Sequence, residues 1–185
     1  MGINKQSARI KHHTSTTTGS FTVPISEDFT DGTWDKWDLA KSEIAVNEAD
    51  ETVSVRIGSG IKRLLTKETI IVAVSDETTA LTTGTSKVTF RMPYKFKLTE
   101  VRASLTGAGS TSGTTTIDIN ATASSILLPK LTIDYGAKTS TTATIPATIT
   151  TSTLNDDEEI TIDIDAVTGG ANETGLKIYL IGYQL

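Results

Sequence analysis

The chain has 185 residues, a formal net charge of -5 and no cysteine, and 37% of its residues are hydrophobic. The missing cysteines exclude disulfide bonds and thiolate metal sites. Lys and Arg are scattered, which disfavours nucleic-acid binding because phosphate recognition needs concentrated cations. No apolar run approaches the roughly 20 residues of a membrane-spanning helix, so we expect no membrane insertion.

The high threonine content is typical of β-structure. The sequence holds 35 Thr and 16 Ser, and β-branched Thr prefers pleated, half-solvated strands. The first 20 residues are instead polar and mildly basic, without apolar periodicity. They are predicted to be either a disordered tail or an anchoring arm that orders against a larger assembly.

Both tryptophans of the chain, Trp34 and Trp37, lie in the next segment, residues 21–41. Each is a large side chain that is costly to leave in water. We expect the two to pack against the strands that follow or against a neighbouring subunit. Stacking on a sugar ring is the alternative.

Residues 42–65 predict a small β-meander, three short strands joined by two tight turns. Asn, Asp and Gly in the turns supply backbone geometries that β-branched residues avoid. A meander of 24 residues is too small to bury a core alone. We therefore predict that residues 21–73 are an oligomerisation segment. Its apolar residues are expected to form a packing face: Ile44, Val46, Val53, Val55 and Ile57.

The remaining chain predicts strands and no amphipathic helix. After a segment at 66–73 that changes from linker to strand, strands are expected at 87–92, 96–105, 114–120, 125–133 (interrupted by Pro129), 144–150, 159–167 and 175–183. Alternation with polar residues directs five isoleucines to the core: Ile117, Ile119, Ile160, Ile162 and Ile164. The apolar spacing slips between Leu98 and Val101, which indicates a bulge.

About eight strands at short, even spacing predict an all-β fold, an antiparallel sandwich or barrel. We expect a jelly-roll β-sandwich over residues 74–185, preceded by the meander and the polar arm of residues 1–20. An immunoglobulin-like sandwich is the second choice. It is disfavoured because residues 74–185 contain neither tryptophan nor a cysteine pair.

The sequence offers no convincing catalytic constellation. The only histidines, His12 and His13, are adjacent in the polar N-terminal segment, and neighbouring side chains of an extended chain point apart. Asp118, Asp163 and Asp165 alternate with the isoleucines and are predicted to lie on the solvent-facing side of the sheets. We therefore expect no enzymatic activity and no cofactor.

The acidic loop at residues 155–159, Asn-Asp-Asp-Glu-Glu, concentrates oxygen atoms of the kind that calcium prefers. No interleaved glycine shapes it like an EF-hand loop. We expect a solvated acidic turn, with a weak cation site as the alternative, and assign no metal ligands.

Two parts of the chain resemble bacteriophage structural proteins. The first comprises 42–47, Asp50 and the strand 53–56, and it follows a stretch at 31–34 that reads Asp-Gly-Thr-Trp. This pattern is similar to one in phage fibre and appendage proteins. The second part covers most of 74–185, through residues 75–81, 88–94, 101–104, 116–120 and 158–165. It resembles head-fibre, tail-fibre and capsid-decoration proteins, including those of phages of Bacteroidetes and crAss-like phages.

This resemblance implies a non-enzymatic virion protein, made in the host cytoplasm and exposed on the particle. It also implies a homotrimer, and closed cyclic symmetry avoids open-ended fibres. Residues 1–20 are then expected to bind capsid or other virion proteins, residues 21–73 to interlock the subunits, and residues 74–185 to face outward. The protein is expected to decorate or stabilise the particle, or to aid host attachment.

Three loops are expected to form any contact surface, including one for host surface glycans: 106–113, 134–143 and 168–174. Loops on a rigid scaffold carry recognition most readily. The alternative is a tail- or neck-associated carbohydrate-binding adhesin that uses Trp34, Trp37 or a tyrosine. Aromatic residues are only 5% of the chain, which weighs against it. A secreted bacterial surface module is the third hypothesis, disfavoured because no signal peptide is recognised.

Overall fold

The computed structural model describes residues 13–15, 44–47, 52–57, 59–64 and 66–185. The chain divides into two compact units, residues 1–65 and residues 66–185. The fold is all-β, as predicted, with one short 3-10 helix, η1 (Ser140–Thr142), among the described residues. In the described part, no helix has the length and hydrophobicity needed to cross a membrane.

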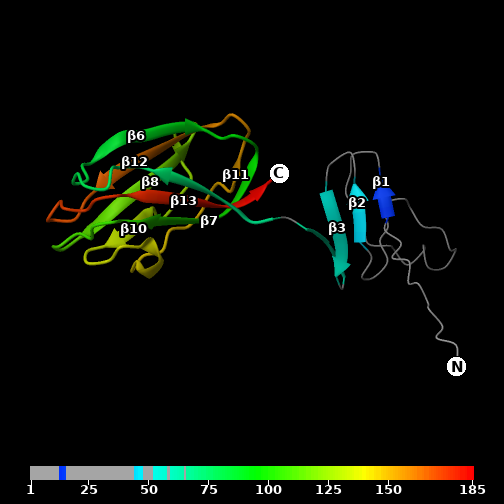
Figure 1. Cartoon of the computed structure of the whole chain (residues 1–185), viewed down its shortest axis with the longest axis horizontal. Helices are drawn as coiled ribbons and strands as arrows, with labels where there is room; N and C mark the ends of the chain where they lie inside the picture. The colour runs from blue at the N-terminus through cyan, green and yellow to red at the C-terminus, as the bar shows by residue number, and fades with distance from the viewer. Residues whose placement is uncertain (1–12, 16–43, 48–51, 58, 65) are drawn as a thin grey trace, which may run out of the picture. The chain divides into compact units, whose positions relative to one another are not determined.

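The first unit contains the predicted meander (Figure 1). Strands β2 (Ile44–Asn47), β3 (Thr52–Ile57) and β4 (Gly60–Arg63) pair in antiparallel order. A further strand, β1 (His13–Ser15), pairs in parallel with β2. The N-terminal segment, predicted as a tail or an anchoring arm, therefore contributes an edge strand to this sheet.

The second unit is a sandwich of two antiparallel sheets (Figure 1). One sheet has the order β10-β8-β12-β6, with β9 also paired to β8, and the other has the order β11-β7-β13-β5. The strands of this unit are β5 (Glu68–Ala73), β6 (Gly84–Arg91), β7 (Phe96–Ser104), β8 (Thr114–Ala121), β9 (Ser124–Ser125), β10 (Leu131–Asp134), β11 (Thr153–Leu154), β12 (Glu159–Ala166) and β13 (Lys177–Gln184).

The strand pairs of the sandwich are nested along the chain. Strand β5 pairs with β13, β6 with β12, β7 with β11 and β8 with β10. This nesting is consistent with the predicted jelly roll, in which one long antiparallel ribbon is wound into two sheets. Because β5 pairs with the last strand, the sandwich unit begins at residue 66 rather than at residue 74, where the sequence division placed it.

The core lies between the two sheets, and the described residues that build it belong to the second unit. Five isoleucines predicted to face inward are all buried: Ile117, Ile119, Ile160, Ile162 and Ile164. The predicted bulge is also present. Leu98 and Glu100 of β7 oppose the consecutive residues Gly182 and Ile181 of β13, so Thr99 is the extra residue.

The strand predicted at residues 144–150 is wrong, since these residues form no strand. Their ladder contact is a single bridge from Ile149 to Leu127. Backbone hydrogen bonds join residues 148–150 to residues 126–129. Side chains hold the start of the segment: Thr144 donates hydrogen bonds from its backbone N and its Oγ1 to Asp134, and the carbonyl of Ile145 accepts one from Thr132. Such side-chain bonds offer the backbone an alternative to a sheet ladder.

Candidate functional site

The three loops predicted as a contact surface lie together at one end of the sandwich (Figure 1). The backbone N of Gly136 donates to the carbonyl of Gly109 at 2.8 Å, and the N of Gly169 donates to the carbonyl of Ser112 at 3.0 Å. These bonds join residues 106–113 to each of the other two loops. The three segments therefore form one surface with a fixed backbone.

Glycine is required where these loops approach most closely. A Cβ atom on Gly109 would overlap Thr168 Oγ1 and would lie 2.9 Å from Glu173 Oε1. At Gly113, φ is +100°, a conformation that L side chains rarely adopt. Gly109 is therefore a packing position, and Gly113 is a turn position.

Glu173 anchors this end of the sandwich from inside. Its side chain is fully buried, and Oε1 accepts hydrogen bonds from Thr115 Oγ1 at 2.8 Å and from the backbone N of Thr168 at 2.7 Å. Burial alone raises the pKa of the carboxyl, but the hydrogen bonds from Thr168 and Thr115 outweigh it and hold the pKa below its usual range. Sequence reasoning placed Glu173 in a surface loop and missed this role.

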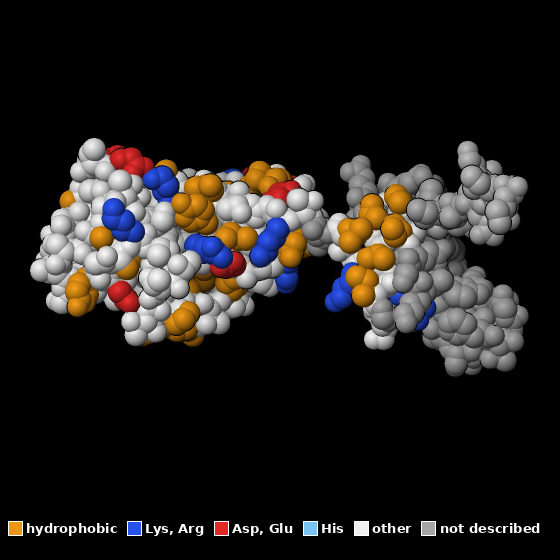
Figure 2. Space-filling model, turned by 60° about the horizontal axis from the view of Figure 1, so that its bottom comes forward, with side chains coloured by type: hydrophobic (Ala, Val, Ile, Leu, Met, Phe, Trp, Pro, Cys, Tyr) orange, Lys and Arg blue, Asp and Glu red, His pale blue; other side chains and the backbone are white. Residues whose placement is uncertain are grey.

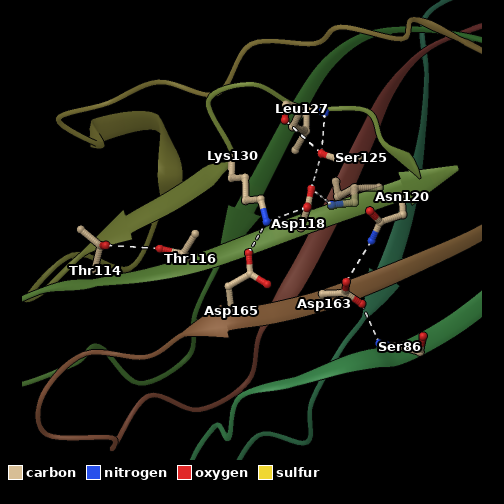
Figure 3. A network of polar contacts seen from close by, with 11 residues as sticks. Ser86, Thr114, Thr116, Asp118, Asn120, Ser125, Leu127, Lys130, Asp163 and Asp165 are labelled. Carbon is tan, nitrogen blue, oxygen red and sulfur yellow. Dashed lines mark hydrogen bonds and ion pairs between the residues drawn. The ribbon is translucent and has the colours of Figure 1, made fainter. Parts of the chain in front are cut away.

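A polar network covers one face of the sheet that contains β8 and β12 (Figure 3). Asp118 was predicted to face solvent, and this prediction is wrong: the residue is 4% exposed. Lys130 Nζ lies 2.8 Å from Asp118 Oδ2 and 2.6 Å from Asp165 Oδ2. Ser125 Oγ donates a further bond to Asp118 Oδ1 at 2.6 Å. Asp118 is buried because residues 124–130 fold back over this face.

The other predicted carboxylate of this face, Asp163, also has partners. Its Oδ2 accepts from Asn120 Nδ2 at 3.0 Å, and its Oδ1 accepts from the backbone N of Ser86 at 2.6 Å. Asp118, Asp163 and Asp165 are therefore engaged in hydrogen bonds and ion pairs on the sheet. Lys130 was not singled out from the sequence, because its partners lie 12 and 35 residues away.

Three carboxylates of the acidic loop at 155–159 have hydrogen-bond or ion-pair partners. Glu158 Oε2 accepts from the backbone N of Asn155 at 2.6 Å. Arg91 lies 3.8 Å from Asp157 and 3.5 Å from Glu159, and it also donates to the carbonyl of Asp157. Within the described residues, no group of three or more His, Asp or Glu is placed to hold a metal ion.

The apolar residues of the meander share one face of its sheet. Ile44 opposes Val55, and Val46 opposes Val53. We call this surface the meander face and include Leu64, which bonds to the carbonyl of Val53: Ile44, Val46, Val53, Val55, Ile57 and Leu64. The predicted packing residues Trp34 and Trp37 lie outside the described residues.

The meander face has exposed apolar side chains, whereas the opposite, more polar face is buried at Ala45, Asn47 and Ser54. Ile57 is 62% exposed, Leu64 55% and Ile44 40%, but Ala45 and Asn47 are fully buried. Figure 2 shows hydrophobic side chains gathered on the surface of this unit. Contiguous exposed apolar side chains of this kind mark interaction surfaces.

A second exposed apolar site lies at the end of strand β10. Tyr135 and Ile145 are 58% and 57% exposed and line a shallow groove of about 400 Å³. Tyr135 belongs to the predicted contact loop 134–143. Ile145 was assigned to a strand, and no local sequence signal places it beside Tyr135, ten residues away.

No protein-family model, curated protein or solved structure matches this chain.

Proposed function

We propose that this chain is a non-enzymatic structural protein of a bacteriophage virion, displayed on the particle surface as a head fibre or capsid decoration. The meander unit joins copies of the chain into a homotrimer. The sandwich unit faces outward, and residues 1–20 attach the assembly to capsid or other virion proteins. In this role the protein stabilises the particle or aids host attachment.

The observation that carries this proposal is the exposed meander face. The sandwich buries its own core, whereas the meander presents Ile44, Ile57 and Leu64 to solvent. Full burial of one Ile or Leu side chain contributes about 1.5–3 kcal/mol. Covering three partly exposed side chains in every copy therefore provides a favourable free energy for association.

A second copy of the chain is the occupant that fits this surface. Strands β2 and β3 contribute apolar residues to the meander face, and Leu64 contributes one directly after β4. Identical faces can therefore pack on one another without burying an unpaired carboxylate. Lys62 opposes Val55 and shares this face, but none of the described residues on the face is a carboxylate. A trimer is the state that the resemblance to phage fibre proteins implies, and it closes the assembly.

The oligomeric state tests the assembly. We expect the full-length protein to be a trimer by light scattering, and Ile57→Glu to dissociate it, because burying an unpaired carboxylate is strongly unfavourable. Its association constant should fall by at least about 100-fold, or roughly 3 kcal/mol. Ile71→Glu is the matched control: Ile71 is 59% exposed but lies on β5 of the sandwich, so this variant should remain a trimer.

A stable monomer at high micromolar concentration would overturn the shared interface. Dissociation by Ile71→Glu, with Ile57→Glu unaffected, would move the interface to the sandwich. The location on the particle is tested by immunogold labelling of intact virions of the encoding phage, for which we expect label on the capsid. Label confined to the tail or neck would favour the adhesin alternative, and unlabelled particles would reject a virion protein.

A carbohydrate-binding adhesin on the tail or neck is the second candidate. The observation that favours it is the groove beside Tyr135, where an exposed aromatic ring lies among polar side chains. Amphipathic aromatic rings of this kind suit ligands with one apolar and one polar side.

A further inference from the structure

The groove at the end of β10 has an apolar part that nothing in the described chain covers. Tyr135 and Ile145 line it with large side chains that are more than half exposed. Tyr135 follows β10 directly, and its backbone N donates to the carbonyl of Gly113 at 3.2 Å. The aromatic ring is therefore carried on a backbone that is tied to strand β8, which limits the ordering cost of binding.

The polar part of the groove offers hydrogen-bond acceptors. Thr144 donates from its backbone N at 2.9 Å and from Oγ1 at 2.8 Å to Asp134 Oδ2. Thr132 Oγ1 donates to the carbonyl of Ile145 at 3.1 Å. Each of these hydroxyls has used its only proton and keeps lone pairs. Asp134 Oδ1 accepts no hydrogen bond from the described residues, so it too is available to a donor.

These two parts define the ligand. It needs several O–H or N–H donors, spaced along a groove, and one apolar surface that can lie against a tyrosine ring. The groove residues include no Lys, Arg or His, so they provide no partner for a sulfate, phosphate or carboxylate. A quaternary ammonium cation has no N–H donor for these acceptors, and its attraction to an exposed aromatic ring contributes only about 0.5–1 kcal/mol.

We propose that this groove binds a neutral pyranose, a hexose or N-acetylhexosamine at the end of a surface glycan. The C–H face of the sugar lies on Tyr135 and Ile145, and its hydroxyls donate to Asp134 Oδ1 and to the oxygens of Thr132 and Thr144. The groove volume of about 400 Å³ is within the range of small-ligand sites. This inference rests on the proposed role in host attachment and names the ligand class for it.

Saturation-transfer difference NMR on the full-length protein tests the site with glucose, galactose, mannose and their N-acetylamine forms. We expect millimolar binding of at least one of these sugars. Tyr135→Ala should weaken it about tenfold, since an aromatic contact contributes up to about that factor. Tyr135→Phe keeps the ring, so its dissociation constant for the sugar should stay within about threefold of the value for the original protein. Asp134→Asn should also weaken binding, because it exchanges an acceptor oxygen for a donor.

Leu128→Ala is the matched control, because Leu128 is 73% exposed and does not line the groove. It should leave sugar binding unchanged. Thermal unfolding of every variant separates loss of binding from loss of fold, and Tyr135→Ala should unfold normally because its backbone bond to Gly113 is retained.

Three results would overturn the inference. They are the absence of a signal for any of these sugars, binding that Tyr135→Ala leaves unchanged, and preferential binding of tetramethylammonium or of an acidic sugar. Each is distinguishable from failure of the proposed function, which is read from trimer formation and virion labelling. A trimer on the particle that binds no sugar rejects the groove alone, and a sugar-binding monomer rejects the assembly alone.

Discussion

Two carboxylates face each other directly across the strand pair β8–β12. Asp118 and Asp163 are register partners, and like charges in such positions are destabilising. The structure resolves the conflict by giving each carboxylate its own partners: Lys130 for Asp118, and Asn120 with Ser86 for Asp163 (Figure 3). At the level of the residue, this face is a structural ion-pair network, and its carboxylates are not free for chemistry.

Glu173 allows a residue-scale prediction of pH dependence. The pKa of its carboxyl is lower in the folded protein than its ordinary value, so its contribution to stability is present above the ordinary glutamate pKa of about 4.3 and is lost as the pH falls through the folded pKa. Glu173→Gln should be less stable than the original protein by about 1 kcal/mol at pH 7, because bonds to a charged acceptor are stronger.

Urea unfolding of the two proteins at several pH values measures this effect. The difference in their free energies of unfolding should shrink as the pH falls below about 5 and through the folded pKa of Glu173. Comparison with the Gln variant removes the contribution of the other carboxyls, which titrate in both proteins. A difference that stays constant over this range would show that the ionised form of Glu173 is not favoured by folding.

At the scale of the element, the pairing of β7 with β13 depends on one glycine. Gly182 opposes Leu98 next to the bulge. A Cβ atom on Gly182 would overlap the carbonyl oxygen of Lys97 and would lie 2.7 Å from the ring of Phe96, which is fully buried. The close approach of the β7 backbone at Lys97, together with the Phe96 ring, therefore requires a residue without a side chain at position 182.

Gly182→Ala should destabilise the sandwich by about 1–3 kcal/mol, because the backbone of β7 must move to admit the methyl group. The measurement is the midpoint of urea unfolding. Gly60→Ala is the control, since a Cβ at Gly60 would meet nothing within 4 Å, and it should change stability by less than about 0.5 kcal/mol. Equal midpoints for the two variants would contradict the proposed packing constraint.

Elements with a local signal were predictable from the sequence, and those defined by distant partners were not. The alternation around Ile117 and Ile162 and the irregular spacing near Val101 indicated strand faces and the bulge correctly. The burial of Asp118 depends on Lys130 and the fold-back of residues 124–130, which no periodicity shows. Likewise, β5 was divided from the sandwich because its partner β13 lies more than 100 residues further along the chain.

The same limit applies to the candidate sites. The turn residues and β-branched runs of 42–65 predicted the meander and its shared face, because strand alternation alone decides which residues point the same way. The groove beside Tyr135 was not predicted. It combines a loop with residues 144–145, which a strand assignment placed in the sheet, and its acceptor character arises from the bonds of Thr132 and Thr144.

At the scale of the whole molecule, the two units differ in how much apolar surface each buries to offset the conformational entropy lost on folding. Among the described residues, the hydrophobic core of the sandwich draws on members of the second unit, within residues 70–180. The meander, in contrast, leaves its apolar face in solvent. We therefore expect the second unit to fold independently of assembly, and we expect the first unit to gain further apolar contacts from the proposed association between copies.

A fragment of residues 66–185 should accordingly fold alone as a monomer, with one cooperative unfolding transition. The unfolding midpoint of the fragment should not depend on protein concentration. In the full-length chain, the part of the transition that reports on the first unit should depend on concentration, because association stabilises the unit that forms the interface. Light scattering and thermal unfolding at several concentrations measure both properties. A fragment that assembles as the full-length protein does would place the interface on the sandwich, and one that fails to fold would show that residues 1–65 complete its core.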